Sequence, residues 1–277
     1  MHLYININGE VIPGSQLVLP ASNRSYRYGE GLFETMKVAD GRIILDDYHF
    51  ERLETGMQLL QYKVPALFRK ENIRKEIIYL CQKNNCENLA RVRLSVSRGS
   101  GGLLDSDNMF QYIVECWPLD GPDSYRSGLV IDIYPDARKS CDVFSNLKSA
   151  NYLPYVMAAQ FSKENKLDES LILNVHERIC DATIANVFWV KSEVIFTPPL
   201  SEGCIAGVMR RYLLENLQTS GFQVKEQKLE TTDLGDANEI FLTNAIRGIR
   251  WVKQFRNKIF ENTHSLKIFN ELITTLF

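Results

Sequence analysis

Short apolar runs separated by turn residues dominate the first part of the chain. Residues 4–7 alternate between apolar and polar, Asn8-Gly9 is a hairpin dipeptide, and residues 11–12 are apolar again. This pattern predicts a β-hairpin, because a period of two is typical of a half-buried strand. Further strands are predicted at residues 33–38, 42–45, 91–97 and 111–117.

Two segments of the first part instead have helical spacing. Asp46 is the predicted N-cap of a helix whose apolar positions are Tyr48, Leu53, Met57 and Leu60. A second helix is predicted over residues 71–83, with a buried stripe made by Ile73, Ile77, Ile78 and Leu80.

A stretch rich in Pro, Asp and Gly at residues 118–123 interrupts the regular pattern. We therefore expect a smaller N-terminal α+β domain at 1–117, a linker at 118–124 and a larger domain at 125–277. In the larger domain, strands are predicted at residues 129–134, 171–174, 187–190, 194–196 and 239–242, and helices at 152–161, 207–217 and 266–277. The strands fall in runs rather than in strict βα alternation, which favours an α+β fold.

Composition narrows the class of protein without naming a function. The 277 residues carry 32 Lys plus Arg against 34 Asp plus Glu, a net charge of −2, with 45% hydrophobic and 24% charged residues. These globular values argue against disorder, collagen and coiled coil, and the near-neutral charge gives no footprint for nucleic acid or a membrane surface. No apolar stretch approaches the ~18 residues that span a bilayer, and no signal peptide is evident, so we expect a cytoplasmic protein.

The cysteines give a similar expectation. Six of them are spread along the chain without a C-x-x-C pair, at positions 81, 86, 116, 141, 180 and 204. A zinc site requires cysteines that are closer together in the sequence, and a disulfide framework is typical of short chains rich in cysteine. We therefore predict reduced thiols and no metal site.

Several residues are candidates for binding a phosphate or for covalent chemistry, but each is ambiguous when taken alone. Gly207 opens a predicted helix, whose first N–H groups favour an anion, and Thr243-Asn244-Ala245 follows a predicted strand. Lys148 lies among small and polar residues, and a lysine held near apolar surface can form a Schiff base. Taken singly, a solvated lysine and an ordinary turn are the commoner interpretations.

Read in order, the motifs remove this ambiguity. They are Tyr28-Gly29-Glu30-Gly31-Leu32-Phe33-Glu34-Thr35, His49-Phe50-Glu51-Arg52-Leu53, Lys148-Ser149-Ala150-Asn151-Tyr152-Leu153, Asp181-Ala182-Thr183-Ile184-Ala185-Asn186-Val187-Phe188-Trp189, Thr197-Pro198 and Gly207-Val208-Met209-Arg210. Together they resemble the class IV (fold type IV) pyridoxal-phosphate enzymes, over nearly the whole chain. The resemblance implies a two-domain, D-amino-acid aminotransferase-like fold with the active site in the interdomain cleft. A domain that kept the fold but lost the cofactor is the non-enzymatic alternative.

The resemblance also implies the cofactor ligands. Lys148 matches the lysine that forms the aldimine with pyridoxal 5'-phosphate, and Arg52 matches the arginine that holds its phosphate. Asp181 stands where the family usually has a glutamate at the pyridine nitrogen, and it is one methylene shorter; Glu177 is the nearest other carboxylate. The remaining cofactor positions are Val208, Met209 and Ala245, whose backbone N–H groups match the phosphate cup, and Tyr152 near the phenolic oxygen.

Within the family, the motifs most resemble aminodeoxychorismate lyase, an enzyme of folate biosynthesis. This implies conversion of 4-amino-4-deoxychorismate to 4-aminobenzoate and pyruvate by a cytoplasmic homodimer. The alternative is an aminotransferase for branched-chain or D-amino acids with 2-oxoglutarate, which Glu34 favours. Expected substrate-binding residues are Arg93, Arg98 and Asn244, together with Arg27 and Tyr28 from the neighbouring subunit.

Overall fold

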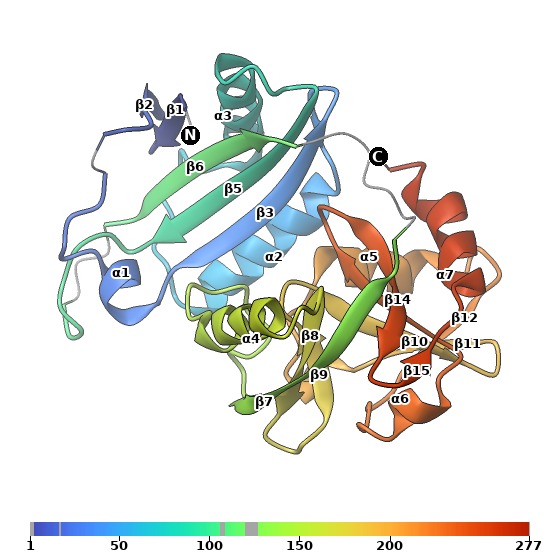
Figure 1. Cartoon of the computed structure of the whole chain (residues 1–277). Coiled ribbons are helices and arrows are strands. Elements are labelled where there is room, and N and C mark those ends of the chain that lie inside the picture. Colours follow the sequence, from blue (N-terminus) through green and yellow to red (C-terminus); the bar gives the residue numbers. More distant parts are fainter. Residues whose placement is uncertain (1–2, 17, 106–108, 120–126, 277) are drawn as a thin grey trace. The chain divides into compact units, whose positions relative to one another are not determined.

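The structure is a computed structural model and describes residues 3–16, 18–105, 109–119 and 127–276. The chain divides into two compact units (Figure 1). Unit 1 comprises Met1–Pro122 and Lys148–Asn151, and unit 2 comprises Asp123–Leu147 and Tyr152–Phe277. The predicted linker at 118–124 lies largely outside the described residues, and the predicted domain boundaries remain predictions.

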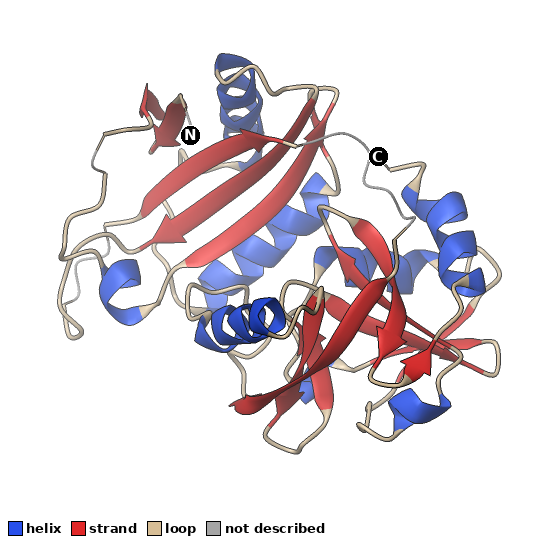
Figure 2. Cartoon of the chain, in the orientation of Figure 1, coloured by secondary structure: helices blue, strands red, loops and turns tan. Residues whose placement is uncertain are grey.

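Unit 1 is a six-stranded antiparallel sheet with the order β2-β1-β6-β5-β3-β4. Helix α2 packs on β3, and α3 packs on β1 and β6 (Figure 2). The strands are β1 (Tyr4–Ile7), β2 (Glu10–Pro13), β3 (Leu32–Ala39), β4 (Arg42–Ile43), β5 (Leu89–Ser97) and β6 (Gln111–Pro118). The helices are α1 (Arg24–Tyr28), α2 (Asp46–Leu59) and α3 (Lys70–Lys83).

The elements predicted for unit 1 are found, because periodicity and turn chemistry agree there. Ile73, Ile77 and Leu80 are fully buried along α3, as a 3.6-residue period requires. Two details were wrong. Ile78 is only half-buried, and α2 begins at Asp46 itself, with Leu45 as its N-cap in the left-handed region at φ 55°. Asp46 still favours the helix, since a carboxylate in the first turn offsets the positive end of the helix dipole.

Unit 2 contains a nine-stranded mixed sheet with the order β12-β11-β10-β13-β14-β7-β8-β9, and β15 pairs with β14. Its strands are β7 (Leu129–Lys139), β8 (Glu169–Asn174), β9 (Ile179–Ala182), β10 (Asn186–Lys191), β11 (Val194–Thr197), β12 (Gln223–Glu226), β13 (Glu239–Asn244), β14 (Gly248–Phe255) and β15 (Lys258–Ile259). Its helical elements are α4 (Leu153–Glu164), η1 (Leu200–Glu202), α5 (Val208–Asn216), α6 (Asp233–Asp236), α7 (Thr263–Ile268) and the π-helical turn η2 (Phe269–Ile273).

The α+β class is confirmed, but unit 2 departs from the predicted elements in several places. Strands β9, β12, β14 and β15 were not predicted, nor were the short helical elements η1 and α6, and β9 carries Asp181. The last helix begins at Thr263 rather than at residue 266 and becomes π-helical at Phe269. None of the described helices is long and apolar enough to cross a membrane.

Candidate active site

The backbone of Lys148–Asn151 is pinned to the start of β3 in unit 1. Phe33 N–H donates to the Lys148 carbonyl at 3.0 Å, Ala150 N–H donates to the Gly31 carbonyl at 2.7 Å, and Leu32 pairs with Ser149 in an antiparallel bridge. The Lys148 Nζ lies 4.6 Å from the centroid of the Phe33 ring. Although Lys148 lies outside the regular strands, these hydrogen bonds fix its backbone and therefore the position from which its side chain extends.

Arg93 on β5 shares the aromatic ring with Lys148. Its guanidinium carbon lies 3.7 Å from the Phe33 centroid, and its Nε donates to Ser95 Oγ at 3.1 Å. Attraction between a cation and a ring face holds such groups near an aromatic side chain. The structure therefore brings the predicted catalytic lysine and the first predicted substrate arginine to one ring.

A buried carboxylate on β3 holds Arg52, the residue predicted to bind the cofactor phosphate. Helix α2 places His49 and Arg52 three residues apart on one face, and both contact Glu34. The distances are 2.8 Å from Arg52 Nε to Glu34 Oε1 and 2.6 Å from His49 Nδ1 to Glu34 Oε2, and a second bond joins Arg52 Nη2 to Glu34 Oε2. This two-point grip orients the Arg52 guanidinium.

Charge and burial oppose each other at this anchor. Burial raises the pKa of Glu34, but the charge of Arg52 and the hydrogen bond with His49 outweigh it and lower the pKa to about 2. For His49, burial lowers the pKa despite the neighbouring Glu34, and the charges of Arg52 and Lys148 act in the same direction. A neutral His49 then donates from Nδ1, and its buried Nε2 has no hydrogen-bond partner among the described residues.

In unit 2, Asp181 is the centre of a buried polar cluster. Its Oδ2 accepts from Lys139 Nζ at 2.9 Å, from Tyr155 Oη at 2.7 Å and from the Ile205 N–H at 2.9 Å. Its Oδ1 accepts from Asn186 Nδ2 at 3.0 Å. A carboxylate offers about four lone-pair directions, two on each oxygen, so Oδ1 retains capacity for a further donor.

The electrostatics of this cluster keep Asp181 paired with a cation. Burial lowers the pKa of Lys139, but the adjacent Asp181 carboxylate more than compensates, and the pKa is raised. Burial, followed by the charge of Asp181, raises the pKa of Tyr155 well above its ordinary value. Lys139 is therefore an ammonium ion and Tyr155 a neutral hydrogen-bond donor.

The first turn of α5 approaches the same cluster, and Gly207 makes this approach possible. A Cβ on Gly207 would lie 1.9 Å from Asn186 Oδ1, so any other residue would force the Asn186 side chain or the helix start to move. Gly207 is the N-cap of α5, and the N–H groups of the first helical residues, Val208 and Met209, have no partner within the helix. This end of α5 is therefore a ready site for an anion.

Thr243, which the sequence analysis considered only as part of the Thr243-Asn244-Ala245 segment, adds a side-chain hydroxyl near this cluster. It pairs directly with Asn186 across β13 and β10, so the two side chains lie on one face of the sheet. Its buried Oγ1 has no hydrogen-bond partner among the described residues. An unpaired buried hydroxyl is costly, which fits a site that a polar ligand completes.

Two further predicted residues, Tyr152 and Arg98, contact aromatic side chains. Tyr152 precedes α4, and its ring stacks on that of Tyr155 at 4.3 Å; Tyr155 in turn donates to Asp181. Arg98 bonds the Leu60 carbonyl, and its guanidinium carbon lies 5.1 Å from the Tyr62 centroid. These two residues remain predictions as ligands.

The predicted substrate residue Asn244 caps a turn. Its Oδ1 accepts from the N–H groups of Ile246 at 3.0 Å and Arg247 at 2.8 Å, an arrangement typical of an Asx turn. The next residue, Ala245, is buried with 9% of its surface exposed. These observations do not test the predicted roles. Because its Oδ1 is used in the turn, Asn244 can offer a ligand only its side-chain NH₂ group.

The predicted partner-subunit residues and the alternative carboxylate all lie at the surface. Arg27 is exposed, its Nε donates to the Ala21 carbonyl at 3.0 Å, and Tyr28 is 42% exposed. Glu177 is solvent-exposed and pairs with Arg138 at 2.7 Å, whereas Asp181 is 1% exposed. Asp181 is therefore the buried one of the two candidate carboxylates.

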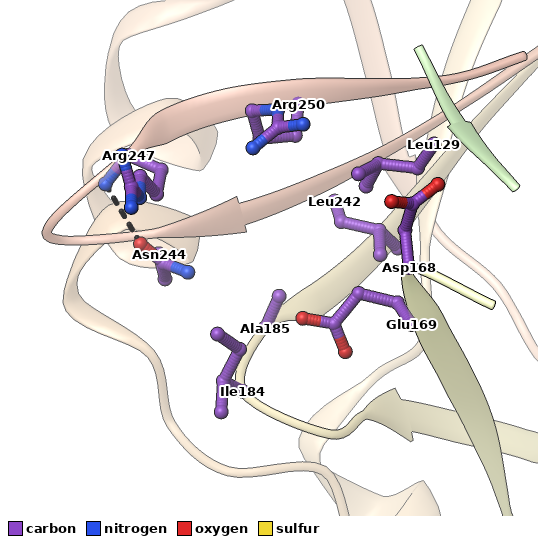
Figure 3. A pocket seen from close by; sticks show the side chains of 9 residues that line it. All are labelled: Leu129, Asp168, Glu169, Ile184, Ala185, Leu242, Asn244, Arg247 and Arg250. Carbon is purple, nitrogen blue, oxygen red and sulfur yellow. Dashed lines mark hydrogen bonds between the residues drawn. The ribbon is translucent and has the colours of Figure 1, made fainter. Parts of the chain in front are cut away.

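A cavity in unit 2 has a different lining. Figure 3 shows Asn244 and Arg247 on one side and Glu169 with Asp168 on the other. Burial raises the pKa of Glu169 to about 7 despite its bond with the Thr183 backbone and the charge of Arg250. Of the predicted site residues, the cavity contains only Asn244, so it is not the cluster around Asp181.

Comparison with known proteins decides the family. The chain matches the family described as amino-transferase class IV over residues 31–255. The protein belongs to the class IV amino-transferase family. This family depends on pyridoxal phosphate, and the resemblance inferred from the motifs is confirmed.

Relatives of more than one activity are similar to this class IV protein. An aminodeoxychorismate lyase of Vibrio harveyi is 29% identical over 239 residues, covering 84% of this chain and 86% of the relative. A putative branched-chain-amino-acid aminotransferase of Methanocaldococcus jannaschii is 27% identical over 265 residues, covering 93% and 90%.

Solved structures confirm the fold. A putative 4-amino-4-deoxychorismate lyase of Legionella pneumophila has a TM-score of 0.84 at 26% identity, covering 95% of this chain and 96% of that one. A branched-chain amino acid aminotransferase of Escherichia coli has a TM-score of 0.90 at 20% identity, covering 100% and 95%.

Proposed function

We propose that this class IV protein is a pyridoxal-phosphate enzyme that acts as a 4-amino-4-deoxychorismate lyase and produces 4-aminobenzoate and pyruvate. The observation that carries the proposal is the position of Lys148, whose Nζ lies at the Phe33 ring beside Arg93. This arrangement joins a proton-carrying amine to a cation suited to a substrate carboxylate. The lyase relatives support this choice of reaction, as does the resemblance of the motifs, among them Gly207-Val208-Met209-Arg210, to aminodeoxychorismate lyase.

The described residues fit the cofactor at three of its groups. The N–H groups at the start of α5 and the guanidinium of Arg52 suit the phosphate, because both are cationic or partially positive. The free capacity of Asp181 Oδ1 suits a protonated ring nitrogen, and the unpaired Thr243 Oγ1 suits a further polar atom. Lys148 supplies the amine.

When bound, pyridoxal phosphate draws electrons from the carbon that carries the substrate amine and so makes its C–H bond acidic. In the proposed reaction, the free Lys148 amine removes this ring proton. The C–O bond to the enolpyruvyl group then breaks, and the ring becomes aromatic. Lys148 returns a proton to the methylene carbon of the leaving group, which yields pyruvate; one amine acts as both base and acid.

The other residues hold the participants in place. Arg93 binds a carboxylate of the substrate, and Ser95 fixes its guanidinium through the bond at 3.1 Å. Asp181 would accept a hydrogen bond from the protonated ring nitrogen, and Lys139 holds the Asp181 carboxylate in place through the buried ion pair at 2.9 Å. Two hydrogen bonds with Glu34 fix the Arg52 guanidinium, which would hold the phosphate.

The second candidate is a class IV aminotransferase for branched-chain or D-amino acids with 2-oxoglutarate. The branched-chain relative supports it, as does Glu34, which aminotransferases carry at this position. In that reaction Lys148 would move a proton within the substrate without breaking a C–O bond.

The two reactions are separated by their products. We expect the purified enzyme to release 4-aminobenzoate from 4-amino-4-deoxychorismate, and we expect Lys148→Ala to abolish this release. Lys63→Ala is the matched control, because Lys63 is exposed on unit 1. Amino-group transfer from amino acids to 2-oxoglutarate with no aromatic product would refute the lyase assignment.

We also propose a cytoplasmic homodimer in which Arg27 and Tyr28 of one subunit complete the site of the other. Co-expression of Lys148→Ala with Arg27→Ala tests the dimer, because a mixed dimer would contain one site with both residues intact. Restored activity is the expected result. Activity of the Arg27→Ala variant equal to that of the wild-type enzyme would exclude a role for Arg27.

A further inference from the structure

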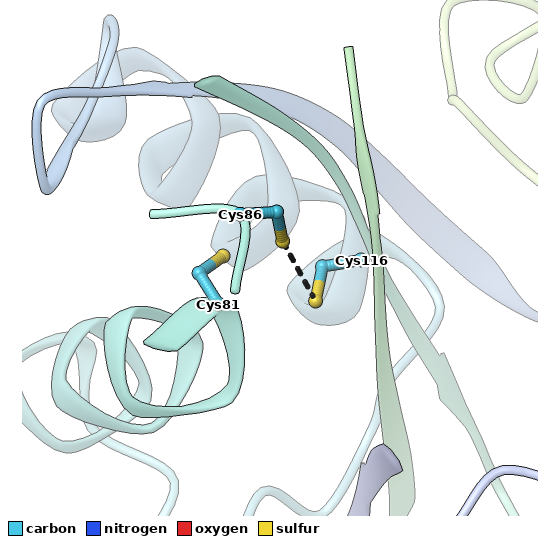
Figure 4. A group of neighbouring side chains, drawn as sticks. All are labelled: Cys81, Cys86 and Cys116. Atoms are coloured by element: carbon cyan, nitrogen blue, oxygen red, sulfur yellow. Dashed lines mark hydrogen bonds between the residues drawn. The ribbon is translucent and has the colours of Figure 1, made fainter. Parts of the chain in front are cut away.

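Three cysteines, two of them close in the sequence and the third 30 residues further along, meet in the interior of unit 1 (Figure 4). Cys81 lies near the end of α3, Cys86 in the turn that follows, and Cys116 on β6. Their Sγ atoms all lie within 4.8 Å of one another, and the Cys86 and Cys116 sulfurs are 3.7 Å apart. The expectation that the cysteines are not clustered was therefore wrong for these three, because the fold closes a gap of 30 residues.

The protein holds the three thiols in fixed positions. The Cys86 N–H donates to the Cys81 carbonyl at 2.9 Å, which closes the turn after α3. Asn84 Nδ2 donates to Cys116 Sγ at 3.1 Å, and Asn84 is itself held by two hydrogen bonds with the backbone of Tyr4. The thiols are free of disulfides and almost completely buried, with 0%, 4% and 2% of Cys81, Cys86 and Cys116 exposed.

The electrostatic environment disfavours net negative charge in the cluster. All three cysteine side chains are almost completely buried, and moving an uncompensated charge from water into such an interior is unfavourable. A ligand that leaves charge on three thiolates is therefore costly here.

Thiophilic ions differ in the net charge that they would leave in this buried cluster. Three thiolates around Cu(I) carry a net charge of −2, and around Zn²⁺ a net charge of −1. Zinc sites in proteins also take four ligands, whereas the cluster formed by the described residues offers three. A trivalent ion with three thiolates is neutral, so it requires no buried counter-charge.

We propose that Cys81, Cys86 and Cys116 form a binding site for a trivalent thiophilic metalloid, As(III) or Sb(III). Arsenous acid, As(OH)₃, reacts with the three S–H groups: three As–S bonds form and three As–O bonds break. The three thiol protons leave with the three hydroxyl groups as water. Arsenic and sulfur keep their oxidation states, so the step requires no oxidant or reductant.

Capture at this site would join α3, the following turn and β6. We therefore expect slower amide hydrogen exchange near the end of α3 and along β6 when the site is filled, because three-point attachment restrains local opening. Segments of unit 2 should keep their exchange rates. This effect does not depend on the proposed enzymatic activity.

The test uses the reduced full-length protein and sodium arsenite. We expect native mass spectrometry to record one arsenic per chain with the loss of three hydrogens. Cys116→Ser and Cys86→Ser should weaken binding by more than about 100-fold, since even outer-shell changes cost about 10–100-fold in metal sites. Cys141→Ser is the matched control, because Cys141 is a free cysteine of unit 2, and it should bind arsenite as the wild-type protein does.

Thermal unfolding of each variant, measured without arsenite, shows whether it is folded before binding is compared. Using two single variants guards against misfolding of either one. Three results would overturn the proposal: no arsenic retained by the wild-type protein, equal retention by folded Cys116→Ser, or tight one-to-one zinc binding without arsenite binding.

Discussion

The buried anchor formed by Glu34, His49 and Arg52 makes stability depend on pH in a defined direction. The folded pKa of Glu34 is about 2 against an ordinary value of 4.5. The difference corresponds to about 3 kcal/mol, because one pKa unit is ~1.4 kcal/mol. The Glu34 side chain is 2% exposed, so solvent screens this energy little.

The sign follows from the lowered pKa. A carboxyl group that is more acidic in the folded state stabilises it above the unfolded pKa. This contribution is lost as the pH falls from about 4.5 toward 2. Glu34→Gln removes the charge at every pH and takes the carboxylate away from the Arg52 guanidinium. We therefore expect the variant to be about 3 kcal/mol less stable than the wild-type protein at pH 7, and the two to converge toward pH 2.

Urea unfolding followed by circular dichroism, at intervals from pH 7 to pH 2.5, measures this difference. Glu177→Gln is the matched control, since Glu177 makes an exposed pair with Arg138 and should change stability far less. A difference between wild type and Glu34→Gln that stays constant across the pH range would refute the reasoning. The loss would then come from packing rather than from charge.

Three further variants test the rest of the site. Arg52→Ala should raise the dissociation constant of pyridoxal phosphate about 10–150-fold, from the loss of a charge-assisted contact of ~1.5–3 kcal/mol; an absorbance titration checks this. Lys139→Met should lower the free energy of unfolding by about 3–5 kcal/mol, because it removes the cation paired with Asp181. Urea unfolding should show that Lys139→Met combined with Asp181→Asn recovers most of this stability. Gly207→Ala should weaken cofactor binding in the same titration, because its Cβ would lie 1.9 Å from Asn186 Oδ1 and displace the first turn of α5.

The sequence predicted the elements of unit 1 well because local signals agree there. The Asp40-Gly41 turn has the positive φ values of 48° and 70° that a tight hairpin requires, and alternation sets the register of the strands. Strand β9 was missed because it is only four residues long and fully buried, so it shows no alternation. Its neighbour β8 supplies the pairing that makes it a strand, and that pairing is not visible in a single sequence.

The candidate site divides in the same way between local and long-range signals. Lys148, Arg52 and Gly207 are found from short motifs, whereas Lys139 and Tyr155 carry no local signal. Lys139 is the last residue of β7 and lies 42 positions from Asp181, and the parallel pairing of β7 with β8 and the antiparallel pairing of β8 with β9 bring the two together.

This placement also answers the question raised by the short Asp181 side chain. A free aspartate one methylene shorter than glutamate could turn to several partners, but three donors on Oδ2 and one on Oδ1 fix its carboxylate plane. In the proposed site, this fixed orientation offsets the shorter side chain, and Lys139 pairs with the buried carboxylate at 2.9 Å. Any substitution that frees Asp181 to rotate should therefore impair cofactor binding, even where the negative charge remains.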